Sequence, residues 1–163
     1  MAESSPVTDG SGAPAEGDLV DHVGIVVRDL DASLAFYQGV LGFAPFGHES
    51  LPDVGVRVVY LASDQPGTTI LQLVEPTKAG PLMDFLDSQG DGLHHICLAV
   101  ADIPEALGRL APGASVRIVV GGRGRRACFL PGLREGLRIE LTEIEPWAAR
   151  QAPLSRRNEE DGR

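Results

Sequence analysis

The stretch VDHVGIVV at residues 20–27 recurs as LHHICLAV at residues 93–100. Both copies alternate along the chain in the way that a strand with one buried face requires. An aspartate follows each copy, Asp29 and Asp102, where its side chain can cap the start of a helix. An offset of 73 residues (93 minus 20) therefore indicates an internal duplication.

The same order of elements is expected after each copy. Apolar residues spaced to form one helical face come first: Leu30, Leu34 and Tyr37 in one half, Ile103, Leu107 and Leu110 in the other. Three strand-like runs then follow in each half, with Gly- or Pro-bearing turns between them, at about 43–49, 54–62 and 68–75 and at about 114–120, 126–130 and 136–143. Each half is predicted to be a βαβββ module in an α+β fold, and a short helix at 81–87 is expected to link the modules.

Length and composition predict a single domain. A chain of 163 residues with 43% hydrophobic content can bury one good core but not two ordinary catalytic domains. We expect one domain over residues 18–149, with modules at about 19–76 and 92–145. Residues 1–17 and 150–163 are rich in small, polar and charged residues and are predicted to be disordered tails.

Charge and cysteine usage narrow the possible functions. A net charge of −9 and an isoelectric point near 4.8 argue against binding to nucleic acid or to an anionic membrane. Apolar runs such as residues 96–101 are far shorter than the roughly 18 residues that span a bilayer, and no export signal is visible. Cys97 and Cys128 lie in apolar runs and form no CxxC pair, which favours reduced thiols and a cytoplasmic location.

Four polar residues occupy matched places in the two halves. His22 and His95 lie on the first strands, and alignment of the last strands matches Gln72 with Glu140. A single strand histidine is more often a hydrogen-bonded core residue than a ligand. Each of these four side chains, however, is expected on the face that points away from its helix. If the first and last strands of each half pair side by side, all four converge between the modules.

This donor set predicts a catalytic divalent metal. Two imidazoles, an amide oxygen and a carboxylate suit cobalt, nickel, zinc or manganese better than calcium. Four protein ligands in an octahedron leave two positions open for a chelating substrate.

The segment from about Leu19 to Glu143 resembles the vicinal oxygen chelate (glyoxalase I-like) superfamily, and within it most closely the methylmalonyl-CoA epimerases. That resemblance implies a cupped eight-stranded mixed sheet around a metal. The matching segments are DHVGIVVRDLDASLAFYQGVLGF (21–43), LQLVEP (71–76), GDGLHHICLAVADI (90–103), GGRGRRACFL (121–130) and GLRIELTE (136–143).

The resemblance also implies a ligand set and a reaction. The metal ligands would be His22, Gln72, His95 and Glu140, and the glutamine favours epimerases over the glyoxalase I branch, which usually has a carboxylate there. His94 is expected on the opposite strand face, in a structural role. The implied activity interconverts the 2R and 2S forms of methylmalonyl-CoA through a metal-stabilised enolate, with cobalt the leading metal and zinc, nickel or manganese as alternatives. An acyl-CoA thioester partner and a homodimer are expected.

Glu140 is the leading acid/base residue, and the second one is open. Some epimerases carry a glutamate where this chain has Val58, which cannot move a proton. Glu49 is the candidate that we carry forward, with Asp53 or a water molecule as alternatives.

The basic turn at 121–126 resembles a Gly-rich epimerase segment. Its arginines, Arg123, Arg125 and Arg126, are expected to bind the phosphates of coenzyme A or of a carrier-protein thioester. The alternative is an exposed loop that only aids solubility. Two departures lie near the expected substrate entrance: Val54 stands where epimerases often have a polar residue, and the turn after Leu130 is one residue shorter.

Three other functions stay open at this stage. The first is a related enolising isomerase or lyase on another thioester or β-dicarbonyl, or a glyoxalase-like enzyme. The second is an iron-dependent oxygenase, in which Gln72 as a fourth ligand would leave less room for oxygen and substrate. The third is a metal-free protein of the same fold that binds a small molecule or confers resistance.

Overall fold

The computed structural model describes residues 19–63, 69–132 and 137–144, so the predicted tails lie outside the described residues. Within these ranges, eight strands form one mixed sheet in the order β2-β3-β4-β1-β5-β8-β7-β6. The strands are β1 (Leu19–Val26), β2 (Ala44–Leu51), β3 (Val56–Ala62), β4 (Ile70–Pro76), β5 (Gly92–Val100), β6 (Val119–Val120), β7 (Arg126–Phe129) and β8 (Arg138–Glu143). The helices are α1 (Leu30–Gly39), α2 (Pro81–Gln89) and α3 (Ile103–Leu110), with a 3₁₀ turn η1 at Gly122–Gly124.

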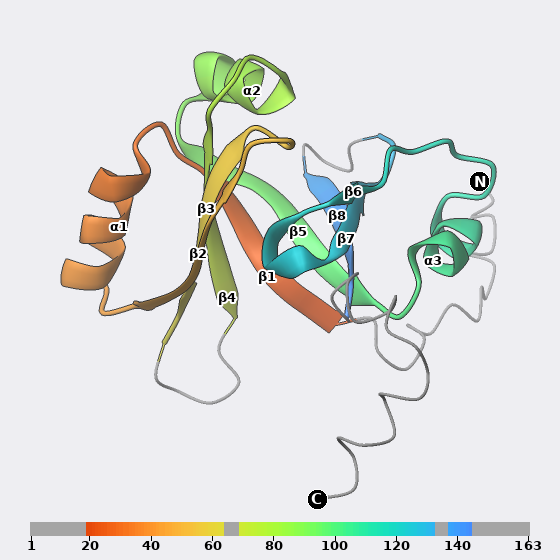
Figure 1. The fold of residues 1–163 in the computed structure, drawn as a ribbon, viewed down its shortest axis with the longest axis horizontal. Helices are drawn as coiled ribbons and strands as arrows, with labels where there is room; N and C mark the ends of the chain where they lie inside the picture. The colour runs from red at the N-terminus through yellow and green to blue at the C-terminus, as the bar shows by residue number, and fades with distance from the viewer. Residues whose placement is uncertain (1–18, 64–68, 133–136, 145–163) are drawn as a thin grey trace, which may run out of the picture.

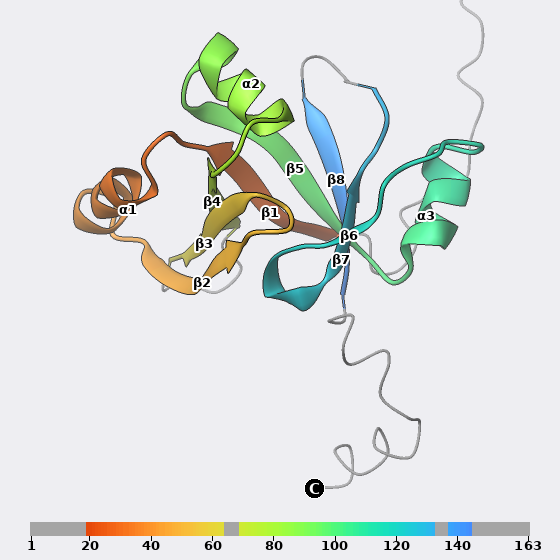
Figure 2. The same cartoon turned by 45° about the horizontal axis from the view of Figure 1, so that its top comes forward.

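The duplication predicted from the sequence is confirmed. Each module runs strand, helix, three strands, and α2 connects the two modules. In both modules the first strand pairs in parallel with the last, β1 with β4 and β5 with β8. β1 and β5 pair antiparallel and join the modules at the centre of the sheet, as Figure 1 shows. Figure 2 shows the sheet curled between its two outer edges, with α1 and α3 at opposite ends of the molecule.

The two faces of β1 pack against different helices. Ile25 and Val27 belong to a core cluster that also holds Leu30 of α1. Val26, on the other face, packs in a separate cluster with Leu86 of α2. His22 lies on the same face of the strand as Val26, so the side of the sheet that faces away from α1 is the one that carries the predicted metal ligands.

Both predicted helix caps are present. Asp29 accepts a hydrogen bond from the backbone N–H of Ala32 at 2.9 Å, and Asp102 accepts one from Glu105, also at 2.9 Å. Such caps contribute about 1 kcal/mol each to stability. None of the described helices is both long and apolar enough to cross a bilayer.

The strand expected at 114–120 was predicted too long. Only Val119 and Val120 form strand pairs, with Arg126 and Ala127 of β7. β6 lies at the edge of the sheet, where one neighbour supplies all of its hydrogen bonds. The apolar residues that alternate over 114–118 pack against the core cluster of α3, as Val116 and Ile118 do. Their alternation therefore comes from packing on a helix and not from strand pairing.

Gly24 leaves space that the neighbouring strand uses. A Cβ atom at this position would overlap the imidazole ring of His95, which lies over the glycine. We therefore expect Gly24→Ala to displace that ring and to lower the free energy of unfolding by about 1–3 kcal/mol, the usual cost of overpacking. Urea unfolding measures the effect. Gly92→Ala is the matched control, because a Cβ there meets no atom within 4 Å; equal loss in both variants would contradict this explanation.

Candidate metal site

Three predicted ligands meet at one point inside the curled sheet. The Nε2 atoms of His22 and His95 lie 3.4 Å apart. Glu140 Oε2 lies 3.5 Å from the first and 3.4 Å from the second. Both histidines are buried and the Glu140 side chain is 17% exposed, so one side of the group is open to a ligand.

The size of this triangle fits a bound cation. Zinc–nitrogen and zinc–oxygen bonds of about 2.0–2.2 Å place neighbouring donors of one coordination shell roughly 3.0–3.5 Å apart. His22, His95 and Glu140 already have that separation, and each offers a suitable donor atom. Two imidazoles and a carboxylate are ligands for zinc, cobalt, nickel or manganese. The residues present therefore fit a divalent metal, and the geometry does not select among these ions.

Gln72 lies beside the triangle, on the strand next to His22. Gly24 pairs with Gln72 on β4 and with His95 on β5, so these two side chains flank the glycine on one face of the sheet. The amide Nε2 of Gln72 donates a hydrogen bond to the hydroxyl of Tyr60 at 2.9 Å. Because the nitrogen is used in this way, the amide oxygen is the atom that Gln72 can offer to a cation.

Tyr60 stays protonated at neutral pH. Burial raises the pKa of its hydroxyl to about 12. Sequence reasoning had not included Tyr60 in the site, since its apolar neighbours on β3 give it the appearance of an ordinary core residue. The pairing of Tyr60 with Gln72 across β3 and β4 identifies it only once the strand register is known.

The charges of the group compensate one another. Burial alone would lower the pKa of His22, but hydrogen bonds to Asp21 and Glu140 outweigh that effect and raise it. Burial would likewise raise the pKa of Glu140, yet the hydrogen bond from His22 and the nearby imidazoles hold it below its usual range. Without a cation, a proton on His22 therefore relieves the repulsion among the three sets of lone pairs.

His94 does not lie on the opposite face, as the sequence alternation predicts. Gly24 pairs with His95 and Ile25 with Leu93, so His94 is the extra residue of a β-bulge. The bulge breaks the alternation and brings His94 Nδ1 to 3.0 Å from His95 Nδ1. The two rings lie 5.3 Å apart between centroids. A bulge leaves no clear mark in a single sequence, which explains the error.

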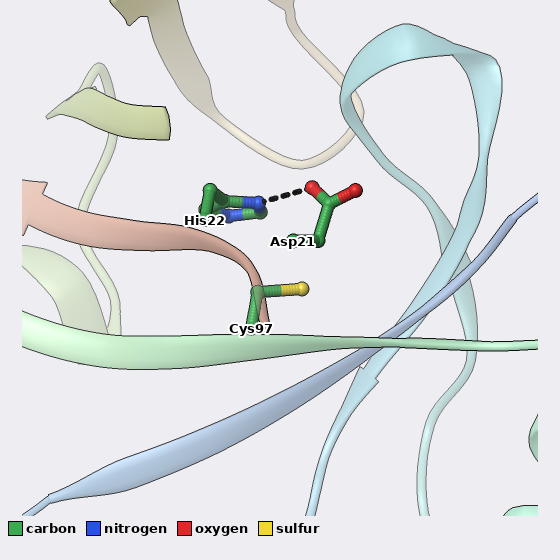
Figure 3. A group of neighbouring side chains, drawn as sticks. All are labelled: Asp21, His22 and Cys97. Carbon is green, nitrogen blue, oxygen red and sulfur yellow. Dashed lines mark hydrogen bonds and ion pairs between the residues drawn. The ribbon is translucent and has the colours of Figure 1, made fainter. Parts of the chain in front are cut away.

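A second group of possible ligands, Asp21, His22 and Cys97, adjoins the first (Figure 3). Asp21 Oδ2 lies 2.7 Å from His22 Nδ1, and its carboxylate also pairs with Arg123 and Arg125. Burial raises the pKa of the Cys97 thiol, so the thiolate that binds metals is disfavoured. These contacts favour the group of His22, His95 and Glu140 as the place for a cation. Cys97 and Cys128 are both free and buried, as expected.

The predicted phosphate-binding arginines all face carboxylates. Arg123 and Arg125 pair with Asp21, and Arg126 lies 3.2 Å from the buried Glu143. The Arg123 guanidinium also lies over the ring of Tyr60, 4.5 Å from its centroid. The turn is thus folded against the site rather than extended from it.

The predicted second acid/base, Glu49, lies at the edge of this site. It pairs across β2 and β3 with Val58, which is buried in the core cluster beneath α2. The Glu49 carboxylate accepts the backbone N–H of Arg123 at 2.8 and 3.0 Å from its two oxygens. Asp53, the other carboxylate considered, lies in the exposed turn between β2 and β3.

Comparison with known proteins gives one family. Residues 21–129 match the Glyoxalase/Bleomycin resistance protein/Dioxygenase superfamily. The chain is 34% identical over 134 residues to an ethylmalonyl-CoA/methylmalonyl-CoA epimerase of Cereibacter sphaeroides, covering 77% of this chain and 97% of that one. It is 32% identical over 131 residues to the uncharacterized protein YqjC of Bacillus subtilis, covering 76% and 91%.

A solved structure is also similar. It is a variant of Streptomyces coelicolor methylmalonyl-CoA epimerase in complex with 2-nitronate-propionyl-CoA. The TM-score is 0.66 and the sequence identity 34%, with 76% of this chain and 95% of that chain covered.

The buried histidines predict how stability depends on pH in the metal-free protein. Burial lowers the pKa of His94 and of His95 from 6.5 to about 4. Between these values the unfolded chain binds two protons that the folded chain does not, so the free energy of unfolding should fall as the pH falls from 6.5 toward 4. His22, whose pKa is raised, is protonated in the folded chain throughout this range and in the unfolded chain once the pH is well below 6.5, so it adds slope only near pH 6.5.

Urea unfolding at a series of pH values tests this dependence. His94→Gln should reduce the pH dependence of the free energy of unfolding by up to the equivalent of one proton. A stability that stays constant across the window would show that the two rings are not held neutral.

Proposed function

The chain belongs to the Glyoxalase/Bleomycin resistance protein/Dioxygenase superfamily, and we propose that it is a metal-dependent epimerase of methylmalonyl-CoA or a closely similar acyl-CoA. The observation that carries the proposal is the convergence of His22, His95 and Glu140 to within 3.5 Å, with the amide of Gln72 beside them. The similarity to epimerases of two bacteria supports the substrate class. A divalent metal, with cobalt the first to test, and a homodimer belong to the same proposal.

His22, Gln72, His95 and Glu140 would hold the metal. When bound, a divalent cation acts as a Lewis acid that stabilises negative charge on a carbonyl oxygen of the substrate. The protein's part is to fix the donors in place before substrate arrives. Gly24 admits the ring of His95, Tyr60 orients the amide of Gln72, and Asp21 contacts His22.

Glu140 is the residue that we assign to proton transfer. It is ionised at neutral pH because its pKa is lowered, and part of its side chain remains accessible. In the proposed reaction the C2–H bond of the substrate breaks, its electron pair enters the enolate, and the proton passes to the Glu140 carboxylate. Return of a proton to the opposite face of C2 gives the other epimer.

Glu49 is our candidate for the group on the opposite face. Its strand partner is Val58, which lies two residues before Tyr60 on β3 and therefore on the same face of that strand. The hydrogen bond from the Arg123 backbone uses acceptor capacity on both carboxylate oxygens and fixes the orientation of the side chain. This placement compensates for Val58, which offers no group that can titrate.

Arg123, Arg125 and Arg126 remain the proposed contacts for the phosphates of the thioester. Each arginine already faces Asp21 or Glu143. A phosphate that binds there must therefore compete with existing ion pairs, and only donors that the carboxylates leave unused are available without rearrangement.

Proton NMR in deuterated water tests the reaction directly. With added cobalt, the C2 proton signal of methylmalonyl-CoA should disappear at a catalytic rate. Glu140→Gln should slow this exchange by roughly 10²–10⁴-fold, the usual contribution of a positioned acid/base. Glu105→Gln, an exposed carboxylate in the first turn of α3, is the control. Undiminished exchange in Glu140→Gln would remove its assigned role, and no exchange by the wild-type protein would reject this substrate.

The role of Glu49 requires the two epimers to be assayed separately. Glu49→Gln keeps an oxygen that can accept the Arg123 N–H but cannot take up a proton at neutral pH. We expect this variant to exchange the C2 proton of one epimer while interconverting the two epimers much more slowly. Wild-type rates from both epimers would eliminate Glu49 and leave Asp53 or a water molecule.

A further inference from the structure

We propose that Asp21 is a positioning residue, which holds the imidazole of His22 so that Nε2 faces the metal site. The proposal deepens the metal site described above and rests on it. Asp21 precedes His22 on β1, and its Oδ2 atom lies 2.7 Å from His22 Nδ1 (Figure 3). Both residues are shielded from solvent, with side-chain exposures of 10% for Asp21 and 3% for His22.

The contact determines which nitrogen of the ring carries a proton. An ionised carboxylate only accepts hydrogen bonds, so Nδ1 must donate and must be protonated. In the neutral ring the lone pair is then on Nε2, which lies 3.4 Å from His95 Nε2 and 3.5 Å from Glu140 Oε2. A partner of this kind on the outer nitrogen fixes both the tautomer and the orientation of a ligating histidine.

Asp21 is itself held from the other module. Arg125 Nη1 donates to Oδ1 at 2.9 Å, and Arg123 Nη2 donates to Oδ2. Arg123 is anchored in turn by its backbone N–H, which donates to Glu49. A carboxylate with donors on both oxygens cannot rotate freely, so the ring that it contacts is also fixed. The two arginine donors, together with His22 Nδ1, make Asp21 a poor direct ligand for a cation.

Asp21 therefore has two separable contacts, one to the ligand His22 and one to the turn that carries the arginines. Asp21→Asn alters both contacts. Arg125→Gln weakens the hold on Asp21 from the turn but leaves the carboxylate next to His22. Comparison of the two variants distinguishes an effect that passes through the imidazole from one that passes through the turn.

The test is metal affinity, measured with zinc and with cobalt by competition against a chromophoric chelator. Asp21→Asn should bind each metal about 10–100-fold more weakly, the usual loss when a partner of a ligating histidine is changed. Arg125→Gln should lose less affinity than Asp21→Asn, because Arg123 Nη2 still holds Oδ2 and the carboxylate stays next to His22. Equal loss of affinity in both variants, or no loss in Asp21→Asn, would overturn the proposal.

A second measurement needs neither metal nor activity. In metal-free protein labelled with ¹⁵N, at an alkaline pH where the ring is neutral, the chemical shifts of the His22 nitrogens should identify Nδ1 as protonated. Asp21→Asn should move the shifts toward a mixture of tautomers, and Arg125→Gln should not. A wild-type ring protonated at Nε2 would contradict the inference.

The role of Asp21 and the metal site can fail separately. If the wild-type chain binds no metal at all, both the metal site and the role of Asp21 are rejected. If only Asp21→Asn fails to change the metal affinity, the role of Asp21 is rejected and the metal site stands.

Discussion

The close approach of three electron-rich atoms in a buried place is the constraint on which the rest of this structure depends. Two imidazole nitrogens and a carboxylate oxygen lie 3.4–3.5 Å from one another with little access to water. Such an arrangement is costly unless a proton or a cation lies among the lone pairs. The neighbouring side chains are consistent with this requirement, since Asp21 accepts a hydrogen bond from His22 and Tyr60 accepts one from Gln72.

Strand register brings the three atoms together. The first and last strands of each module pair in parallel with the same register, so that Gly24 pairs with Gln72 and Cys97 with Glu140. The antiparallel pairing of β1 with β5 then brings the two histidines to the centre of the sheet. The turn over this site comes from the second module and contacts Asp21 of the first, so the site is completed only when both modules are present.

The repeat made the architecture predictable from one sequence. Matching of residues 20–27 with 93–100 placed the histidines on equivalent strands, and the strand alternation placed each on the face away from its own module's helix, both of which the structure confirms. The extent of β6 was not predictable, because alternation cannot distinguish a paired strand from an extended segment that packs on a helix. The bulge at His94 was missed for a related reason: alternation assumes an uninterrupted strand.

Contacts between side chains were the other limit of the sequence. Asp21 stands next to His22 in the sequence, yet nothing there indicates that it faces Arg123 and Arg125, which follow about a hundred residues later. Tyr60 gave no signal until its pairing with Gln72 was known. The composition of the turn at 121–126 predicted contacts with phosphate, while each of its arginines forms an ion pair with a carboxylate of the chain itself.

X-ray absorption spectroscopy of the cobalt-loaded protein identifies the atoms around the ion and therefore tests whether His22, His95 and Glu140 hold it. We expect one cobalt per chain, surrounded by nitrogen and oxygen atoms, with the multiple-scattering signature of two imidazoles and no sulfur. A cobalt–sulfur shell would place the ion at the group formed by Asp21, His22 and Cys97. Either that result or a single imidazole would contradict the site formed by His22, His95 and Glu140.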